Sequence, residues 1–474
     1  MNNRILPVCL PNCYSYDILA DLKVEILIDR NVYEIPVDAV FLMAARKNMK
    51  RGFLFVSKIL GKHIPVHPLI PFIGGAALAG RYASVIYNEK GFEENCDFAQ
   101  ALINQTVMEK TWEYISHNPL PLQERTLFIG FAETATALGH GMFSCFAENA
   151  QYIHTTRENI LDIENVLNFA EEHSHATEHY CYAIDPGLFD NEDMVVLIDD
   201  EITTGKSALN FIKAIQSQYP RKRYGVVSIL DWRGAPEKQR FADAESEMGI
   251  CIHTISLISG SITVSGKPVI DYHEHKMIES FQGRVKSVVE TIVLGKDLGA
   301  LLEFSSFNTN QEKNSVPYLY ATGRFGITSK EQAELDNNFQ QVGLSLRKKR
   351  WGKKTLCLGT GEFMYIPFKI AGYMGEGVSV QSTTRSPIYP SEHTGYAVQQ
   401  AISFSSPGDS LITNYIYNIP KCYYDEVFVF VERAVDAKGL ESLLKALAPL
   451  AIPQIHWVVC VGSSKVKEQI HVGD

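Results

Sequence analysis

Residues 194–215, MVVLIDDEITTGKSALNFIKAI, decide the fold. Their apolar run from Val195 to Ile198 is typical of a strand buried on both faces of a parallel sheet. Two acids, Asp199 and Asp200, follow where that strand would end, and a small-residue turn then leads into a helix. In open α/β sheets, ligands bind beyond the carboxyl ends of the strands, where a helix N-terminus presents free N–H groups to phosphate. The stretch therefore predicts an α/β fold with a ligand site at this strand end.

The acids and the turn suit a phosphorylated sugar. Paired carboxylates suit a sugar diol, a magnesium ion, or both. Small residues let the backbone amides close on a phosphate. A P-loop is excluded, because that motif needs a glycine where Asp200 stands. An ordinary strand–turn–helix with solvated acids is the alternative. The turn residues are Thr203, Thr204, Gly205, Lys206 and Ser207.

Residues 195–207 closely resemble the phosphoribosyl pyrophosphate (PRPP) signature of type I phosphoribosyltransferases, a hydrophobic strand, two acids and Thr-Thr-Gly. Glu201 departs from it, since the family usually has an aliphatic residue there. The resemblance implies that Asp199 and Asp200 are catalytic, hold the ribose hydroxyls, and bind Mg²⁺ directly or through those hydroxyls or water. It also implies that residues 203–207 bind the 5′-phosphate.

A second strand–loop–helix junction lies at residues 126–146. Its small-residue loop could bind another phosphate group, and it resembles the family's pyrophosphate loop. Arg157 ends the next predicted strand, where its rigid fork could clamp a phosphate. Glu133 would repel pyrophosphate unless a metal intervenes or the side chain points away, and a turn without a ligand is the alternative. The candidate residues are Gly130, Phe131, Ala132, Glu133, Thr134 and Arg157.

Two further stretches are candidates for the same site. Residues 171–179, EEHSHATEH, lie where the resembled family has a flexible catalytic loop, and we predict a lid with His175 as its catalytic residue. Zinc binding by the three histidines is the alternative, although no cysteine or aspartate accompanies them. Asp231, Trp232 and Arg233 follow the next predicted strand. They could recognise a flat heterocyclic acceptor or only cap the sheet edge.

Composition limits the class of protein. The formal net charge of −10 argues against a general nucleic-acid binder. The nine cysteines are scattered without a Cys-x-x-Cys pair, which favours reduced thiols. We find no signal peptide and no apolar run of transmembrane length, so we expect a cytoplasmic protein without a membrane partner.

At 474 residues the chain is expected to hold two or three domains. We predict long helices at residues 93–116 and 277–294, a hood within residues 251–270, and a linker at 304–316. A basic segment before the first helix could meet an anion or form a solvated loop. Its members are Lys58, Lys62, His63 and His67.

Residues 355–462 echo residues 126–230, which predicts an internal duplication. The string Ser382 to Arg385 parallels His154 to Arg157, and residues 427–440 align without gaps with residues 195–208. In the second copy Val431 and Glu432 replace the two acids, so a second PRPP site is not expected. Lys353, Lys354 and Arg385 are candidates for a basic residue that reaches the first site.

The string Thr384-Arg385-Ser386-Pro387 resembles the TRSP domain. That domain follows a phosphoribosyltransferase-like domain in proteins of bacterial tellurium-resistance and stress operons, whose implied role is synthesis of a nucleoside-like metabolite. We therefore expect a phosphoribosyltransferase-type parallel sheet with flanking helices and a hood over residues 1–303. The linker 304–316 and a TRSP domain, a degenerate second copy of the same α/β fold, follow over 317–474.

The resulting prediction is magnesium-dependent transfer of the 5-phosphoribosyl group from PRPP to a nitrogenous, nucleobase-like acceptor, with release of pyrophosphate. No residue set selects orotate over purines, and the reverse reaction is chemically equivalent. A non-catalytic PRPP sensor and a scaffold protein are the alternatives, and intact Asp199 and Asp200 argue against the scaffold. A homodimer or an intrachain pseudo-dimer would each be compatible with the duplication.

Overall fold

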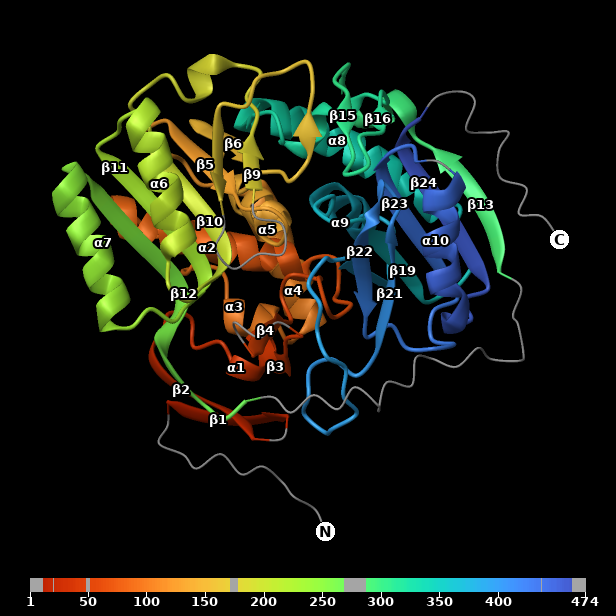
Figure 1. Ribbon diagram of the computed structural model, residues 1–474, viewed down its shortest axis with the longest axis horizontal. Coiled ribbons are helices and arrows are strands. Elements are labelled where there is room, and N and C mark those ends of the chain that lie inside the picture. Colours follow the sequence, from red (N-terminus) through yellow and green to blue (C-terminus); the bar gives the residue numbers. More distant parts are fainter. Residues whose placement is uncertain are drawn as a thin grey trace, which may run out of the picture.

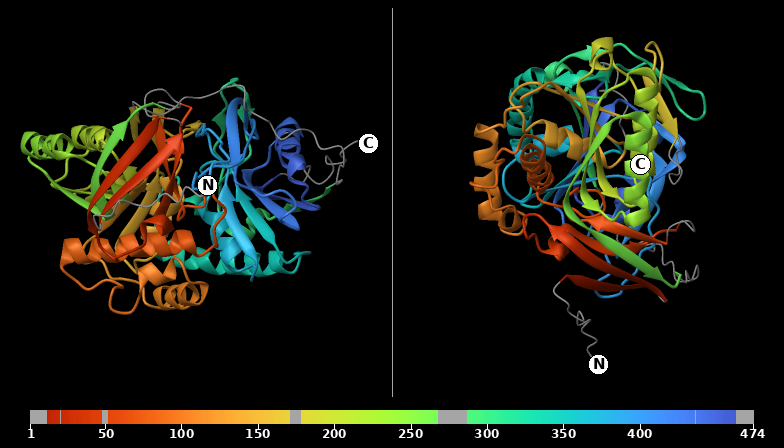
Figure 2. Two further views of the ribbon diagram at one scale, coloured as in Figure 1. Left: turned by 90° about the horizontal axis from the view of Figure 1, so that it is seen from below. Right: turned by 90° about the vertical axis from the view of Figure 1, so that its left-hand side faces the viewer.

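The computed structural model describes residues 12–19, 21–47, 52–170, 178–267, 287–435 and 437–462. Two β-sheets, each flanked by helices, lie side by side (Figure 1). The view from below shows the same two halves side by side (Figure 2). Within the described residues, no helix has both the length and the apolar character needed to cross a bilayer.

The first sheet confirms the predicted α/β class. Its order is β1-β2-β12-β11-β10-β5-β6-β18, and the strands from β12 to β6 are parallel. Residues 195–198 of β10 are fully buried between β11 and β5, as an apolar run in a two-sided sheet requires. The bounds are β1 Cys13–Leu19, β2 Leu22–Asn31, β5 Thr126–Gly130, β6 Ala150–His154, β10 Met194–Ile202, β11 Arg223–Asp231, β12 Cys251–Ser265 and β18 Ile327–Thr328.

Helices cover both faces of the first sheet. α2 (Ile70–Tyr87) and α5 (Ala135–Phe143) pack together on one face, and α6 (Lys206–Gln218) and α7 (Ala235–Met248) lie on the other (Figure 1). The predicted helix over 93–116 is two helices, α3 (Phe98–Ala101) and α4 (Gln105–His117). Asp97 and Asn104 explain the division, because each accepts a backbone N–H bond as an N-cap and so starts its own helix.

The predicted hood segment forms the extension of β12. Its first part pairs with β11, and its last part pairs antiparallel with β2, so the strand continues beyond the parallel sheet. A short helix and a hairpin lie beside this extension. They are α1 (Val37–Val40), β3 (Phe41–Ala45) and β4 (Phe53–Ser57).

The second sheet is parallel and has the order β13-β24-β23-β19-β20. Part of the predicted helix 277–294 is instead strand β13, since the β-branched run at 288–293 favours an extended chain paired with β24; residues 277–286 lie outside the described part. The predicted first unit, 1–303, thus contributes a strand to the second sheet. The bounds are β13 Val288–Val293, β19 Thr355–Gly359, β20 Val378–Ser382, β23 Glu426–Arg433, β24 Gln454–Val461, α8 Ser329–Arg347, α9 Tyr365–Gly372 and α10 Ala437–Leu447.

The two sheets share several local features. The order β24-β23-β19-β20 repeats the order β11-β10-β5-β6. Thr155 N donates to Gly130 O and Thr383 N donates to Gly359 O, both at 3.0 Å. Each sheet also carries a hairpin, joined to it through Thr156 and Thr384 respectively. The hairpins are β8 Leu167–Ala170 with β9 Glu178–Cys181, and β21 Ala401–Ser406 with β22 Asp409–Tyr417.

The predicted linker 304–316 is structured and runs along the junction of the halves. It holds β15 and β16, and β15 pairs with β7 of the first half. At the core of the junction, α5 meets α9, and His140 stacks on Tyr365 with ring centroids 3.5 Å apart. The short elements are β7 Asn159–Ile160, β14 Leu301–Leu302, β15 Ser306–Phe307, β16 Lys313–Asn314, β17 Tyr318–Leu319 and the 3₁₀ turns Pro186–Leu188, Gly295–Leu298, Tyr320–Thr322 and Ala448–Leu450.

Candidate functional site

A cavity of about 880 Å³ opens at the carboxyl ends of β5 and β10. Asp199, Asp200 and Glu201 of β10 line it. The second half closes it with Arg385 and with Leu411, Ile412, Thr413 and Tyr415 of the β22 hairpin. The site therefore lies between the two halves, and both contribute its walls.

The predicted phosphate loop lies in this cavity. All five residues 203–207 line it, and α6 begins at Lys206. Gly205 has φ +69°, and a Cβ there would meet the Phe241 ring at 2.4 Å, so only glycine fits the turn. The structure thus brings the acid pair and the helix N-terminus to one end of the cavity.

The second predicted loop lies beside the first. Phe131 N donates to Ile198 O at 3.1 Å, and Ala132 N donates to Thr155 Oγ1 at 2.9 Å. Residues 131–134 line the cavity. Gly130 shapes the turn from behind, because a Cβ there would lie 2.7 Å from Ala135 O. The hydrogen bonds to β10 and β6 therefore hold the two loops at one sheet edge.

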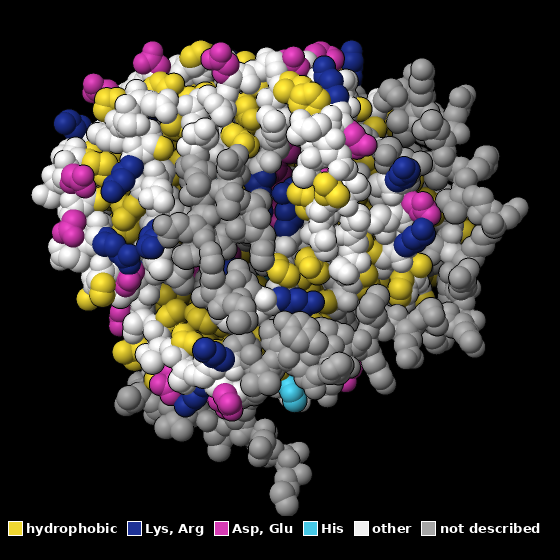
Figure 3. Space-filling view, viewed as in Figure 1, with side chains coloured by type: hydrophobic (Ala, Val, Ile, Leu, Met, Phe, Trp, Pro, Cys, Tyr) yellow, Lys and Arg dark blue, Asp and Glu magenta, His cyan; other side chains and the backbone are white. Residues whose placement is uncertain are grey.

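Positively charged side chains surround Glu133, whose role the sequence left open between metal binding and an orientation away from the site. Its Oε2 lies 3.6 Å from Lys62 Nζ and 3.8 Å from Arg157 Nη1, and Arg385 N donates to it at 3.3 Å. Burial alone would raise the pKa of the Glu133 carboxyl, but the charges of Lys62, Arg157 and Arg385 lower it below its ordinary value. Glu133 is therefore ionised within a cationic cluster. Figure 3 shows basic and acidic side chains together in the hollow between the halves.

The basic segment is divided between the cavity and the surface. Lys62 and His63 are buried and line the cavity, and Lys62 Nζ donates to Thr134 Oγ1. Burial, followed by the charges of Lys62 and Arg46, lowers the pKa of His63 well below its usual value, so the imidazole is neutral. Lys58 bonds to Asp38 O, away from this group. The cluster of basic residues beside Gly61 was the only sequence signal for Lys62.

The proposed acceptor-binding triplet does not line the cavity. Arg233 Nη2 pairs with Asp231 Oδ2 at 2.7 Å, and the guanidinium lies 4.2 Å over the Phe241 ring. Trp232 stacks on Phe55 with centroids 5.2 Å apart, and Phe55 rather than Trp232 lines the cavity. The sequence placed these residues at the strand end correctly, but Asp231 and Arg233 pair with each other and Trp232 packs against Phe55.

The predicted histidine lid lies largely outside the described residues. His173 and His175 fall in that part, so their roles stay predictions. His179 is described on β9; it is fully buried, and its Nδ1 lies 3.2 Å from Thr155 Oγ1. His179 therefore contacts Thr155, the residue whose hydroxyl accepts the hydrogen bond from Ala132 N of the 130–134 loop.

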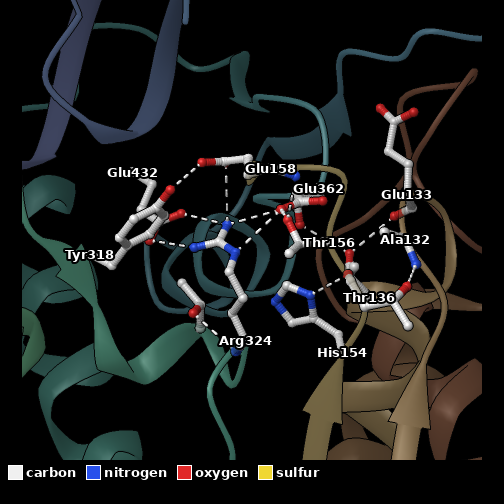
Figure 4. Close-up of polar contacts among 12 residues, drawn as sticks. Ala132, Glu133, Thr136, His154, Thr156, Glu158, Tyr318, Arg324, Glu362 and Glu432 are labelled. Carbon is white, nitrogen blue, oxygen red and sulfur yellow. Dashed lines mark hydrogen bonds and ion pairs between the residues drawn. The ribbon is translucent and has the colours of Figure 1, made fainter. Parts of the chain in front are cut away.

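A second cavity of about 1010 Å³ adjoins the first and shares Glu133, Arg157 and Arg385 with it. Buried Arg324 closes its floor, with Nη2 2.8 Å from Glu432 Oε2 and 3.1 Å from Glu362 Oε1. Figure 4 shows Arg324 pointing between these acids, Glu158 and Tyr318. The position that corresponds to Asp200 in the alignment is thus occupied by an internal ion pair.

The carboxylates of the first cavity fit a magnesium ion that has only some of its ligands from the protein. Asp199 and Asp200 are adjacent carboxylates facing the cavity, and hard oxygen ligands suit Mg²⁺. No group of three or more His, Cys, Asp or Glu side chains that could hold a metal exists among the described residues. The acids therefore fit an ion that takes its other ligands from water and substrate oxygens.

Two family models match the chain. Residues 40–261 match the phosphoribosyl transferase family PRTase_2, and residues 321–447 match the TRSP domain that lies C-terminal to PRTase_2. Over these two ranges the chain matches a phosphoribosyltransferase domain followed by a TRSP domain. The matches confirm the two predicted domain types, and the family that residues 40–261 match is one of enzymes that transfer a pentosyl group.

Solved structures of phosphoribosyltransferases are similar at low identity. The Trypanosoma brucei adenine enzyme, solved with AMP, pyrophosphate and ribose-5-phosphate, is 20% identical with a TM-score of 0.23, over 32% of this chain and 65% of that chain. The Rhodothermus marinus adenine enzyme is 14% identical (TM-score 0.22; 34% and 84% covered), and the Aeropyrum pernix orotate enzyme is 19% identical (TM-score 0.19; 32% and 72%). No curated protein matches the sequence of this chain.

Proposed function

We propose that the phosphoribosyltransferase domain transfers the 5-phosphoribosyl group of PRPP to a nitrogenous acceptor and releases pyrophosphate. One observation carries the proposal: a single cavity has a helix N-terminus, an acid pair and a cationic cluster. These three match the 5′-phosphate, the ribose diol and the pyrophosphate of PRPP. Complementary charge at each end would orient the sugar between them.

Each group has a defined task in the transfer. The amides and hydroxyls of residues 203–207 would hold the 5′-phosphate. Asp199 and Asp200 would bind the ribose hydroxyls and stabilise the positive charge that develops on the ring as the C1–O bond breaks and the C1–N bond forms. Lys62 and Arg157 would hold the departing pyrophosphate. Mg²⁺, held at Asp199 and Asp200, would supply positive charge to the substrate oxygens when bound.

We propose further that the TRSP domain is a degenerate copy of the phosphoribosyltransferase domain. The repeated strand order and the paired threonine contacts support the duplication. Val431 in place of Asp199, and Arg324 bound to Glu432, argue against a second PRPP site. Its contribution to the first site would be Arg385, so that the chain forms an intrachain pseudo-dimer. Lys353 and Lys354 line neither cavity, and Lys354 Nζ lies over the Tyr423 ring.

The acceptor would be a flat heterocycle. Phe53 and Phe55 line the first cavity, and Trp232 supports Phe55 from behind. An aromatic wall suits a planar ring. In keeping with the resemblance of residues 384–387, we propose that the product is a nucleotide-like metabolite used in stress responses such as tellurium resistance, made in the cytoplasm.

Calorimetric titration with PRPP and Mg²⁺ tests the donor site. The wild type should bind, and the Asp199→Asn/Asp200→Asn double variant, if equally folded by circular dichroism, should lose binding. Release of pyrophosphate on addition of candidate heterocycles then tests transfer. Binding without turnover for any heterocycle would favour a PRPP-sensing regulator, and absence of binding by folded wild type would refute the proposal.

Arg385 tests the contribution of the TRSP domain. Arg385→Ala should weaken PRPP binding roughly ten-fold, because it removes one charge from the cationic cluster. Lys353→Ala is the matched control, since it removes an equal charge from a residue outside both cavities. Equal affinity of the two variants for PRPP would show that Arg385 does not contribute to PRPP binding.

A further inference from the structure

Glu133 lies within the cationic cluster of the first cavity. Its side chain is almost fully buried at the boundary that both cavities share. Lys62, Arg157 and Arg385 approach it from three different elements. The carboxylate neutralises part of this positive charge, so the cluster attracts anions while its own acid opposes them.

The contacts of Glu133 are long. All partners reach Oε2, at distances of 3.3 Å from Arg385 N, 3.5 Å from Thr384 Oγ1, 3.6 Å from Lys62 Nζ and 3.8 Å from Arg157 Nη1. Strong charge-assisted hydrogen bonds are shorter, about 2.7–2.9 Å. The other oxygen, Oε1, is buried without a hydrogen-bond partner among the residues that the structure describes. The carboxylate is therefore held by charge rather than by close hydrogen bonds.

Glu362, which stands at the corresponding place in the TRSP domain, is held differently. Its Oε1 accepts hydrogen bonds from Thr156 Oγ1 at 2.6 Å and from Arg324 Nη2 at 3.1 Å. Figure 4 shows the Glu362 carboxylate within the Arg324 cluster, whereas that of Glu133 points away from it. One acid of the pair is thus fixed in a hydrogen-bonded cluster, and the other is not.

We propose that Glu133 is an exchangeable counter-ion that determines the affinity of this subsite for diphosphate. The carboxylate neutralises part of the cluster when no anion is bound, and it gives up these cations when a diphosphate group enters. The inference rests on the proposed function, in which the cluster binds the pyrophosphate of PRPP. Glu133 then favours departure of pyrophosphate, because its carboxylate competes for the same cations.

The binding of inorganic pyrophosphate, measured by calorimetry without and with Mg²⁺, tests this role. Glu133→Gln keeps the size of the side chain and removes its charge, so it should lower the dissociation constant for pyrophosphate about ten-fold without Mg²⁺. Glu362→Gln is the matched control and should leave that constant within two-fold of wild type. In turnover, Glu133→Gln should lower KM for PRPP and also kcat, because the product leaves more slowly.

The outcomes separate the two proposals. An unchanged pyrophosphate constant in Glu133→Gln would overturn the counter-ion role while leaving the donor site intact. If Glu133→Gln bound pyrophosphate more weakly than wild type, and only when Mg²⁺ is present, the counter-ion role would be overturned in favour of a metal-binding role for Glu133. No pyrophosphate binding by any folded variant, wild type included, would refute both this role and the proposed function. Glu133→Asp keeps the charge on a shorter side chain, and should bind pyrophosphate no more tightly than wild type.

Discussion

Single residues decide the shape of the phosphate loop. Gly205 and Gly249 both have a left-handed backbone, with φ +69° and φ +63°. A Cβ at Gly205 would meet the Phe241 ring at 2.4 Å, but a Cβ at Gly249 would have nothing within 4 Å. The two glycines therefore have the same backbone requirement but different space around them.

We predict that Gly205→Ala lowers the free energy of unfolding by about 3 kcal/mol, from the left-handed backbone and the displaced ring together. Gly249→Ala, the control, should lower it by only about 1 kcal/mol. Urea denaturation measures both. Gly205→Ala should also lose PRPP binding, which Gly249→Ala should keep. Equal losses of stability would show that Phe241 moves aside freely.

At the scale of elements, the segment between the two sheets closes the second cavity. β18 pairs with β6 of the first sheet and Tyr318 Oη donates to Glu158 of the first half, while Arg324 pairs with Glu362 and Glu432 of the second half. The Arg324 guanidinium is almost fully buried and lies within 4 Å of Glu158, Glu362 and Glu432. This segment thus connects the halves through ion pairs as well as through strand pairing.

Arg324→Met should lower the free energy of unfolding by about 3–5 kcal/mol, because it leaves buried carboxylates without their cation. The control is Arg223→Met, which removes a partly exposed guanidinium (44%) from the partly exposed Glu124 (33%), and there the loss should be smaller, about 1 kcal/mol. Guanidinium denaturation of both variants makes the comparison. Similar losses would mean that solvent reaches the Arg324 cluster.

At the scale of the whole molecule, the contact between the halves also includes buried neutral histidines. His140 of α5 stacks on Tyr365 of α9 and lies 2.6 Å from Gln332 Oε1 of α8. Burial, above other causes, lowers the pKa of His140 to about 3 and that of His154 to about 3. Because the unfolded chain binds protons at these sites near pH 6.5 and the folded chain does not, acid favours unfolding.

Above about pH 6.5, the pKa of a histidine in the unfolded chain, we predict that these two residues leave the free energy of unfolding independent of pH. Below that pH, their protonation in the unfolded chain should lower the free energy of unfolding. Between pH 8 and pH 5, each should account for a loss of about 2 kcal/mol. His140→Gln should reduce the loss over that range by this amount. Denaturation of wild type and variant at both pH values measures the difference. An identical pH dependence would show that His140 becomes protonated in the folded protein.

The candidate site was predictable where its residues are neighbours in sequence. The acid pair and the 203–207 loop lie on one strand–turn–helix, whose local pattern predicts both its shape and its place at the sheet edge. Lys62 and Arg385 come from distant segments, and nothing local shows that they meet at Glu133. Asp231 and Arg233 show the reverse case, because a strand end alone does not reveal that the two side chains pair with each other in the core.

The sequence by itself determined the strand–turn–helix of residues 194–215, the α/β class and the two domain types, because periodicity, turn chemistry and short motifs are local properties. Only the tertiary structure decided that the two halves face each other across one cleft, that Arg385 of one half lines the cavity of the other, and that Arg324 fills the floor of the second. These features depend on packing between segments far apart in the chain, where burial and charge pairing, rather than local pattern, determine which side chains meet.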